Sequence, residues 1–251
     1  MAKTTSGIAG INNPNKGKRY LFAIAIDEYD EAQSGYPALS NPVLDTTKLS
    51  KVLQDKYGFE AIHEPLTNEE ATRQQILKTL SGLELEEGDT LIVLFSGHGK
   101  EFGLEGHWAA FDSEISDEFS HVSASDISKC LDKQVDARHI FLIIDCCFPD
   151  GIFKNNYVSR FPLNVQDDSR SRLALVSGRN KPVPDGAPGE HSPFARELIA
   201  ILEKNSRPLN VNQLLIELRR KFNGTPQNPS LDSLKLAAHE GGDFELVPKN
   251  F

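Results

Sequence analysis

Two short segments of the chain carry side chains that could do chemistry. His98 stands between two glycines, and Asp145 is followed by two adjacent cysteines, Cys146 and Cys147. A cysteine thiolate is a nucleophile, and a neighbouring imidazole lowers the thiol pKa from about 8.5 and later protonates a leaving amine. Each segment alone has an ordinary structural explanation, a turn with a solvated His or a buried small thiol. Together they predict the thiol–imidazole pair of a cysteine peptidase.

Both segments follow runs of apolar residues. Residues 20–26, 90–95 and 139–144 are almost unbroken apolar runs, which is the pattern of strands covered on both faces. The second run ends just before the His98 turn, and the third ends just before the paired cysteines. In parallel sheets, ligands bind beyond the carboxyl ends of the strands. We therefore expect the imidazole and the thiol to lie side by side at that edge.

Helical patterns separate these runs. Residues 44–57 have helical spacing and stop at a glycine, and Thr67 with Glu70 forms a capping-box pattern before another helix. Further helices are predicted at 123–131, 193–202 and 211–222, and further strands at 172–176 and 244–247. Strands that alternate with helices predict an α/β fold, a three-layer sandwich whose mainly parallel central sheet has helices on both faces.

Composition narrows the class of protein further. The 251 residues include 27 Lys and Arg against 36 Asp and Glu, a net charge of -9 that argues against nucleic acid as a partner. No apolar run approaches the roughly 18 residues of a membrane span. Three cysteines and a polar start without a signal peptide predict a cytoplasmic protein. We expect residues 1–18 to be a polar tail and residues 19–251 to be a single domain.

From residue 19 to the C-terminus the chain resembles the caspase-like cysteine peptidases, the family that includes caspases and metacaspases. The His and Cys segments lie about 50 residues apart, as in caspases. Other matching segments are residues 20–27 (opening strand), 39–52 (first helix), 107–112 (hairpin after the His), 191–202 (helix of the small-subunit half) and 242–247 (last strand). The resemblance implies a caspase-like peptidase domain and is strongest to compact bacterial relatives.

The resemblance also implies roles for individual residues. Metacaspases carry Asp, any residue, Cys at the strand end, which makes Cys147 the nucleophile and Cys146 a core-facing neighbour. His98 would be the general base, and the backbone N–H groups of Gly99 and Cys147 would form the oxyanion hole. Each such donor is typically worth about 3 kcal/mol of transition-state stabilisation.

Substrate preference follows from charge in this family. Metacaspases cleave after Arg or Lys with carboxylates in the pocket, and Asp145, Asp45 and Ser96 match the family's pocket positions. The resemblance therefore implies cleavage of proteins after Arg, and less well after Lys. Asp45 has a plainer alternative as a solvated carboxylate on the side of a helix. The caspase signature for cleavage after Asp, Q-A-C-x-G, is absent.

Some features depart from the family pattern. Residues 148–151 read Phe-Pro-Asp-Gly where a Ser-Gly turn is usual, so this part of the pocket wall has an unusual shape. Residues 167–172 offer basic sites for self-cleavage, or are simply a charged solvated loop. No cofactor is expected. A metal bound by His98, His107 and Cys147 is a weaker interpretation, because the spacing of paired metal ligands is missing.

The resemblance to bacterial caspase-like proteases implies activation by a partner protein in a defence or cell-death pathway. A catalytically silent caspase-like scaffold or regulatory module is the alternative function. A nucleotide-binding protein is disfavoured because no glycine-rich phosphate loop joins a strand to a helix.

Overall fold

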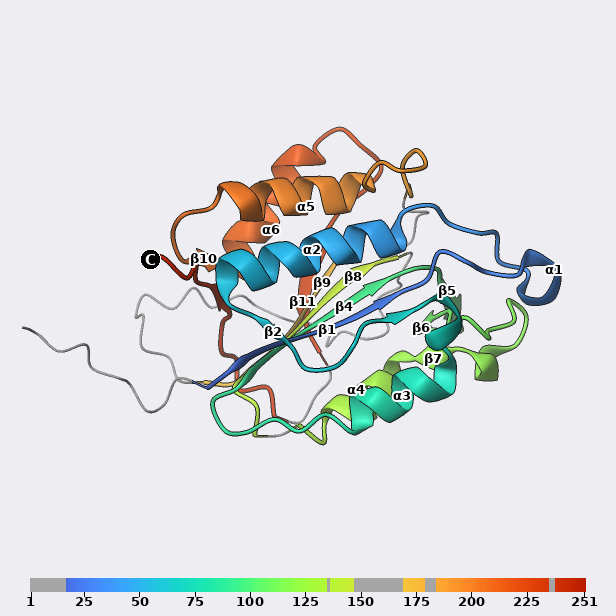
Figure 1. Cartoon of the computed structure of the whole chain (residues 1–251), viewed down its shortest axis with the longest axis horizontal. Coiled ribbons are helices and arrows are strands. Elements are labelled where there is room, and N and C mark those ends of the chain that lie inside the picture. Colours follow the sequence, from blue (N-terminus) through green and yellow to red (C-terminus); the bar gives the residue numbers. More distant parts are fainter. Residues whose placement is uncertain (1–16, 135, 147–168, 179–183, 235–237) are drawn as a thin grey trace, which may run out of the picture.

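The computed structural model describes residues 17–134, 136–146, 169–178, 184–234 and 238–251. At its centre lies a seven-stranded sheet with helices on both faces (Figure 1). The strand order is β11-β9-β8-β4-β1-β2, and β3 also pairs with β1. The strands are β1 (Arg19–Ala25), β2 (Glu60–Ala61), β3 (Leu66–Thr67), β4 (Thr90–Ser96), β8 (His139–Asp145), β9 (Ser171–Val176) and β11 (Ser230–Ser233).

Every pair in this sheet is parallel except β11 with β9. The four inner strands β1, β4, β8 and β9 are almost entirely buried because helices cover both faces, which explains their unbroken apolar runs. The predicted α/β sandwich with a mainly parallel sheet is therefore confirmed. The ends of β4 and β8 lie in register, with Ser96 opposite Asp145.

Each face of the sheet has its own hydrophobic core. Helices α2, α5 and α6 cover one face, and α3, α4 and the small sheet β5-β6-β7 lie on the other (Figure 1). The bounds are α2 (Pro42–Tyr57), α5 (Pro193–Lys204) and α6 (Val211–Lys221) on the first face, and α3 (Arg73–Ser81), α4 (Ala124–Leu131), β5 (Gly99–Phe102), β6 (Glu105–Trp108) and β7 (Val122–Ser123) on the second. We call these the α2/α5 face and the hairpin face.

Successive residues of a strand point to opposite faces, and this alternation decides where the strand ends project. In β8, Ile143 packs in the core of the α2/α5 face and Ile144 in the core of the hairpin face. Asp145 therefore projects toward α2 and α5, whereas Cys146 continues the other row and is buried in the hairpin-face core. Ser96 at the end of β4 follows Leu94 toward the α2/α5 face.

Helix α3 corrects one sequence prediction. It begins at Arg73, and its N-cap is Thr72, whose side chain accepts a hydrogen bond from the Gln75 N–H. The predicted capping box of Thr67 and Glu70 is wrong, because Thr67 makes no side-chain cap bond and leads only into the short 3-10 turn η1 (Asn68–Glu70). Asn68 has a positive φ of 45°, so this turn is separate from α3.

The strand predicted at residues 244–247 exists but lies outside the main sheet. It is β12 (Glu245–Leu246), which pairs antiparallel with β10 (Leu209–Asn210). The remaining short elements are α1 (Glu31–Ser34) and the 3-10 turn η2 (Glu118–Ser120). None of the helices in the described part of the chain is long and apolar enough to cross a membrane.

Candidate active site

A cavity of about 200 Å³ opens at the carboxyl ends of β4 and β8. Its lining includes five residues that the sequence predicted for the site, and these come from three separate segments. They are Asp45, Ser96, His98, Gly99 and Asp145. Cys147, the predicted nucleophile, lies outside the described residues. Its neighbour Cys146 is only 3% exposed but also borders the cavity.

His98 has a defined tautomer in this cavity. Its Nε2 lies 2.8 Å from the backbone carbonyl oxygen of Pro37. A carbonyl can only accept, so Nε2 carries the proton and donates it. The lone pair of the neutral ring is therefore on Nδ1, which is the nitrogen available as a base.

Two tyrosines hold the His98 ring. Tyr36 stacks on it with ring centroids 4.9 Å apart and an interplanar angle of 22°, and Tyr29 meets it edge-on at 4.8 Å. The Tyr29 hydroxyl accepts from the His98 backbone N–H and donates to the carbonyl of Ala109, both at 3.1 Å. Burial lowers the pKa of His98 below its ordinary value, although the Pro37 carbonyl and the charge of Asp185 oppose this shift. The ring is thus kept neutral and fixed.

Asp145 is the most strongly perturbed carboxylate of the site. Its Oδ2 accepts a 2.7 Å hydrogen bond from the Ser192 hydroxyl, but its buried Oδ1 has no hydrogen-bond partner among the described residues. The pKa of Asp145 is raised to about 6, mainly by burial and to a smaller extent by the charges of Asp45 and Asp185. The hydroxyls of Ser177 and Ser192 favour the charged form and partly offset this rise, although Ser177 makes no hydrogen bond of normal geometry.

Asp45 lies in the first turn of α2 and is 3% exposed, so the alternative of a solvated carboxylate is wrong. Its Oδ1 lies 2.6 Å from His191 Nδ1, and its Oδ2 accepts from the Ser192 backbone N–H at 3.1 Å. Burial raises the pKa of Asp45 above its ordinary value, and these two partners oppose the rise. The dipeptide His191-Ser192 therefore holds both Asp45 and Asp145.

Several residues of the site were not predicted from the sequence. Asp185 adds a third carboxylate to the cavity lining, and its side chain accepts from the Ser40 N–H at 2.6 Å. His191 and Ser192 immediately precede α5, where Ser192 is also the N-cap. A Ser before the first Pro of a helix is a recognisable cap signal, but nothing in the sequence connects it to a carboxylate at the end of β8.

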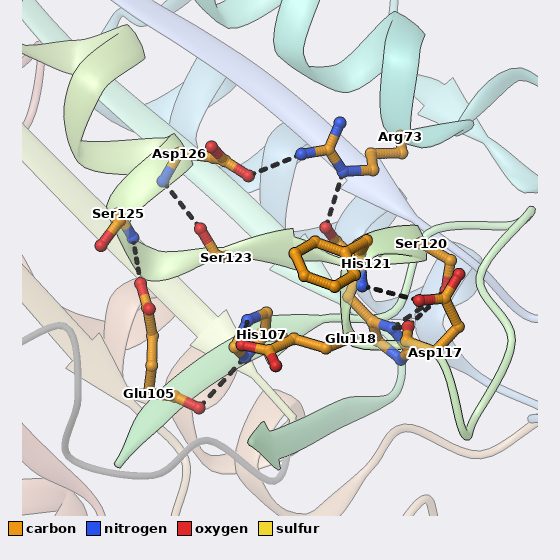
Figure 2. Close-up of polar contacts among 11 residues, drawn as sticks. Arg73, Glu105, His107, Asp117, Glu118, Ser120, His121, Ser123, Ser125 and Asp126 are labelled. Carbon is orange, nitrogen blue, oxygen red and sulfur yellow. Dashed lines mark hydrogen bonds and ion pairs between the residues drawn. The ribbon is translucent and has the colours of Figure 1, made fainter. Parts of the chain in front are cut away.

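The weaker interpretation of a metal bound by His98, His107 and Cys147 involves a residue outside the described part of the chain. Within that part, no group of three His, Cys, Asp or Glu side chains is placed to hold a metal ion. His107 is 2% exposed and does not line the cavity. Its nearest ionic partner is Glu118, at 3.8 Å from Nε2 (Figure 2). His107 therefore belongs to the packing of the hairpin face.

A comparison with known protein families gives the class of protein. A family model described as the caspase domain matches residues 18–239, so the chain belongs to the caspase-domain family. It is a caspase-like cysteine peptidase, a hydrolase that acts on proteins. A search of curated proteins found no match to this chain.

Proposed function

We propose that this peptidase cleaves proteins after Arg, and less efficiently after Lys, with Cys147 as nucleophile and His98 as general base. The observation that carries this proposal is the cavity beside His98, whose lining includes the carboxylates of Asp45, Asp145 and Asp185. A cavity with this charge favours a cationic side chain and disfavours an acidic one.

The chemistry follows from the tautomer of His98. Nδ1 takes the proton of the Cys147 thiol, and the thiolate attacks the scissile carbonyl. The imidazolium that forms is stabilised by the Pro37 carbonyl at Nε2 and by the face of Tyr36. His98 then protonates the leaving amine from Nδ1. A water that gives its proton to the same nitrogen hydrolyses the acyl-enzyme and releases the second product.

The oxyanion of the tetrahedral intermediate needs backbone donors. Gly99 stands opposite Trp108, and the hydrogen bond at this end of the hairpin runs from the Ala109 N–H to the His98 carbonyl. Gly99 is therefore in a non-hydrogen-bonded pair, and the β5–β6 ladder does not use its N–H. This N–H, on a residue that lines the cavity, supports the proposed role of Gly99 together with the N–H of Cys147.

Arg suits this cavity better than Lys does. A buried carboxylate oxygen is costly until a donor reaches it, and Oδ1 of Asp145 has no donor among the residues that the structure describes. The guanidinium has five N–H donors in a planar fork and can bond a carboxylate through two of them at once. An ammonium offers a point charge with fewer fixed contacts. Ser96 adds a hydroxyl to the lining of the same cavity.

We further propose, from the resemblance to compact bacterial caspase-like proteases, that a separate partner protein activates this enzyme. The expected setting is the cytoplasm, in a defence or cell-death pathway. Its substrates would be proteins with an exposed basic residue, and neither nucleic acid nor membrane is expected as a partner.

The test uses fluorogenic peptides that differ only in the residue before the leaving group, Arg, Lys or Asp. We expect turnover in the order Arg, then Lys, with Asp far below both. Cys147→Ala abolishes turnover, whereas the neighbouring Cys146→Ala retains most of it. Preferred cleavage after Asp, or equal loss in both Cys variants, contradicts the proposal. If neither turnover nor labelling of Cys147 by an Arg-chloromethylketone occurs, even in an extract of the source cells that can supply the activating partner, the silent scaffold is the better interpretation.

A further inference from the structure

The segment after α1 supports His98 twice. Tyr36 provides the ring that stacks on the imidazole, and the next residue, Pro37, provides the carbonyl that accepts from Nε2. Any shift of this segment therefore moves both contacts of the base at once. Any contact that holds Tyr36 in place therefore also holds the His98 ring.

The Tyr36 hydroxyl is held by a histidine that the proposed mechanism does not use. Tyr36 Oη lies 2.7 Å from His121 Nε2, and the two residues are 4% and 1% exposed. His121 Nδ1 lies 2.8 Å from the carbonyl oxygen of Asp117, as Figure 2 shows, so Nδ1 must carry the proton. Nε2 of the neutral ring is then an acceptor, and the Tyr36 hydroxyl donates to it. Burial raises the pKa of Tyr36 above its ordinary value and keeps this hydroxyl protonated.

His121 is itself fixed by the hairpin face. The Arg73 guanidinium donates from Nε to the His121 carbonyl at 2.8 Å and from its other side to Asp126 at 2.8 Å (Figure 2). The Phe102 ring packs edge-on against the His121 ring at 5.0 Å. Among the described residues, His121 does not line the cavity, and it reaches His98 through Tyr36.

We propose that His121 is a positioning residue for the general base, acting through the Tyr36 hydroxyl to fix the Tyr36 ring and the Pro37 carbonyl against His98. This inference rests on the proposed function because it takes His98 as the base. It adds a polar anchor on the hairpin face, 85 positions from Tyr36 in the sequence. Because this anchor is rigid, Nδ1 of His98 keeps its direction toward the cavity through the catalytic cycle.

Burial, assisted by neighbouring cationic groups, keeps His121 in the accepting form. The titratable groups that face it are Tyr36, His107 on β6, Lys100 on β5 and Asp117 before η2. Burial lowers the pKa of His121, His107 and Lys100 lower it further, and Asp117 opposes them. A protonated His121 would present N–H at both nitrogens, and Tyr36 would lose its acceptor. The neutral ring therefore preserves the anchor under working conditions.

The test compares variants on both sides of this hydrogen bond. Tyr36→Phe removes one oxygen atom and leaves the stacking ring, His121→Leu removes the acceptor, and His121→Gln retains an acceptor and a donor of similar reach. We expect Tyr36→Phe and His121→Leu each to lower kcat on the Arg peptide about tenfold, with KM within about twofold, because small misplacement of a catalytic group costs rate. The double variant should be no slower than either single variant, and His121→Gln should recover most of the rate.

A second readout separates positioning from stability. Loosening the stack exposes His98 to water, so its apparent pKa rises and the acidic limb of the kcat profile moves to higher pH in Tyr36→Phe. The matched control is Tyr57→Phe, which removes the hydroxyl of another buried tyrosine. That hydroxyl donates to the Leu202 carbonyl at 2.9 Å and accepts from the Asn205 side chain, and Tyr57 packs in the core of the α2/α5 face, so the profile should not move.

The role of His98 as base and the positioning role of His121 can be tested separately. If His98→Ala retains full turnover, the base assignment fails, and the positioning role fails with it. If His98→Ala abolishes turnover while Tyr36→Phe leaves kcat and its pH profile unchanged, only the positioning role is overturned. Additive losses in the double variant overturn it as well. Should His121→Leu not fold, Tyr36→Phe and His121→Gln carry the test.

Discussion

The two walls of the cavity differ in chemistry. On the α2/α5 face, buried carboxylates are held by a helix start, and Asp145 keeps one oxygen unpaired among the described residues. On the hairpin face, the base is enclosed by neutral rings and one carbonyl, with its tautomer already fixed. The first wall thus presents acceptors to a cationic ligand, whereas the second holds an imidazole in place through neutral groups. We infer that substitutions in the first wall mainly change KM for the substrate, whereas substitutions in the second wall mainly change kcat.

The largest effect is expected for Asp145→Asn. Removing one partner of a buried ion pair costs about 4 kcal/mol, so kcat/KM for the Arg peptide should fall about 10³-fold, mainly through KM. Steady-state kinetics with Arg peptides test this. Asp55→Asn, which removes an exposed carboxylate of α2 while leaving the cavity intact, is the control. If Asp145→Asn cleaved the Arg peptide as well as the natural chain does, Asp145 would have no role in binding the substrate.

The same variant should be more stable than the natural chain at alkaline pH. The pKa of Asp145 in the folded state is raised from 3.8 to about 6, so its favourable contribution is complete below about pH 4 and lost as the pH rises through about 6. The amide side chain in Asp145→Asn carries no charge, so the variant does not lose stability as the pH rises through this range. Urea unfolding of the unliganded proteins at pH 8 should therefore give a higher midpoint for Asp145→Asn.

The next largest effect is expected in the pH dependence of KM for the Arg peptide. A cationic side chain binds the charged form of Asp145, whose pKa is about 6 in the empty cavity. Below that pH a proton must leave first, so KM for the Arg peptide should rise about tenfold per pH unit. Alkylation of Cys147 by neutral iodoacetamide does not need the pocket and should follow a different profile. Identical profiles for both measurements would contradict the separation of the two walls.

The smallest effect is expected for Gly97→Ala on the hairpin face. A Cβ at Gly97 would lie 2.8 Å from the Tyr29 hydroxyl, which accepts from the His98 N–H. The phenol must shift, so kcat should fall about tenfold with little change in KM. Overpacking of this kind also destabilises a fold by about 1–3 kcal/mol. Adding Tyr29→Phe removes the clashing oxygen, and part of the lost stability should return. A loss confined to KM would argue against this account.

The sequence predicted the parts of the fold that depend on burial. Three strands of the sheet, β1, β4 and β8, were predicted because covered parallel strands are continuous apolar runs, and the strand predicted at 172–176 is β9. Residues 230–233 read Ser-Leu-Asp-Ser and gave no such signal, although they form the antiparallel edge strand β11. Local capping was also misjudged at Thr67, because a turn at Asn68 separates it from α3.

The candidate site was predictable where it follows strand ends and hidden where it depends on loops. Ser96 and Asp145 end neighbouring strands, so topology alone brings them together. His191 meets Asp45 across 146 positions, and Tyr36 meets His121 across 85. No local pattern encodes such contacts, because they depend on how the connecting segments pack. Asp185 was missed for the same reason.

The division of the sheet into two cores has a consequence for how such an enzyme can change. The residues that we propose to select the substrate, such as Asp45 in α2 and Asp145 at the end of β8, lie on the α2/α5 side of the sheet. Those that we propose to support the base, such as Tyr36 and His121, belong to the hairpin side. Substitutions in one layer leave the packing of the other layer intact. This holds whether they arise during evolution or are introduced by engineering. New cleavage preferences could therefore arise by exchanging one layer alone.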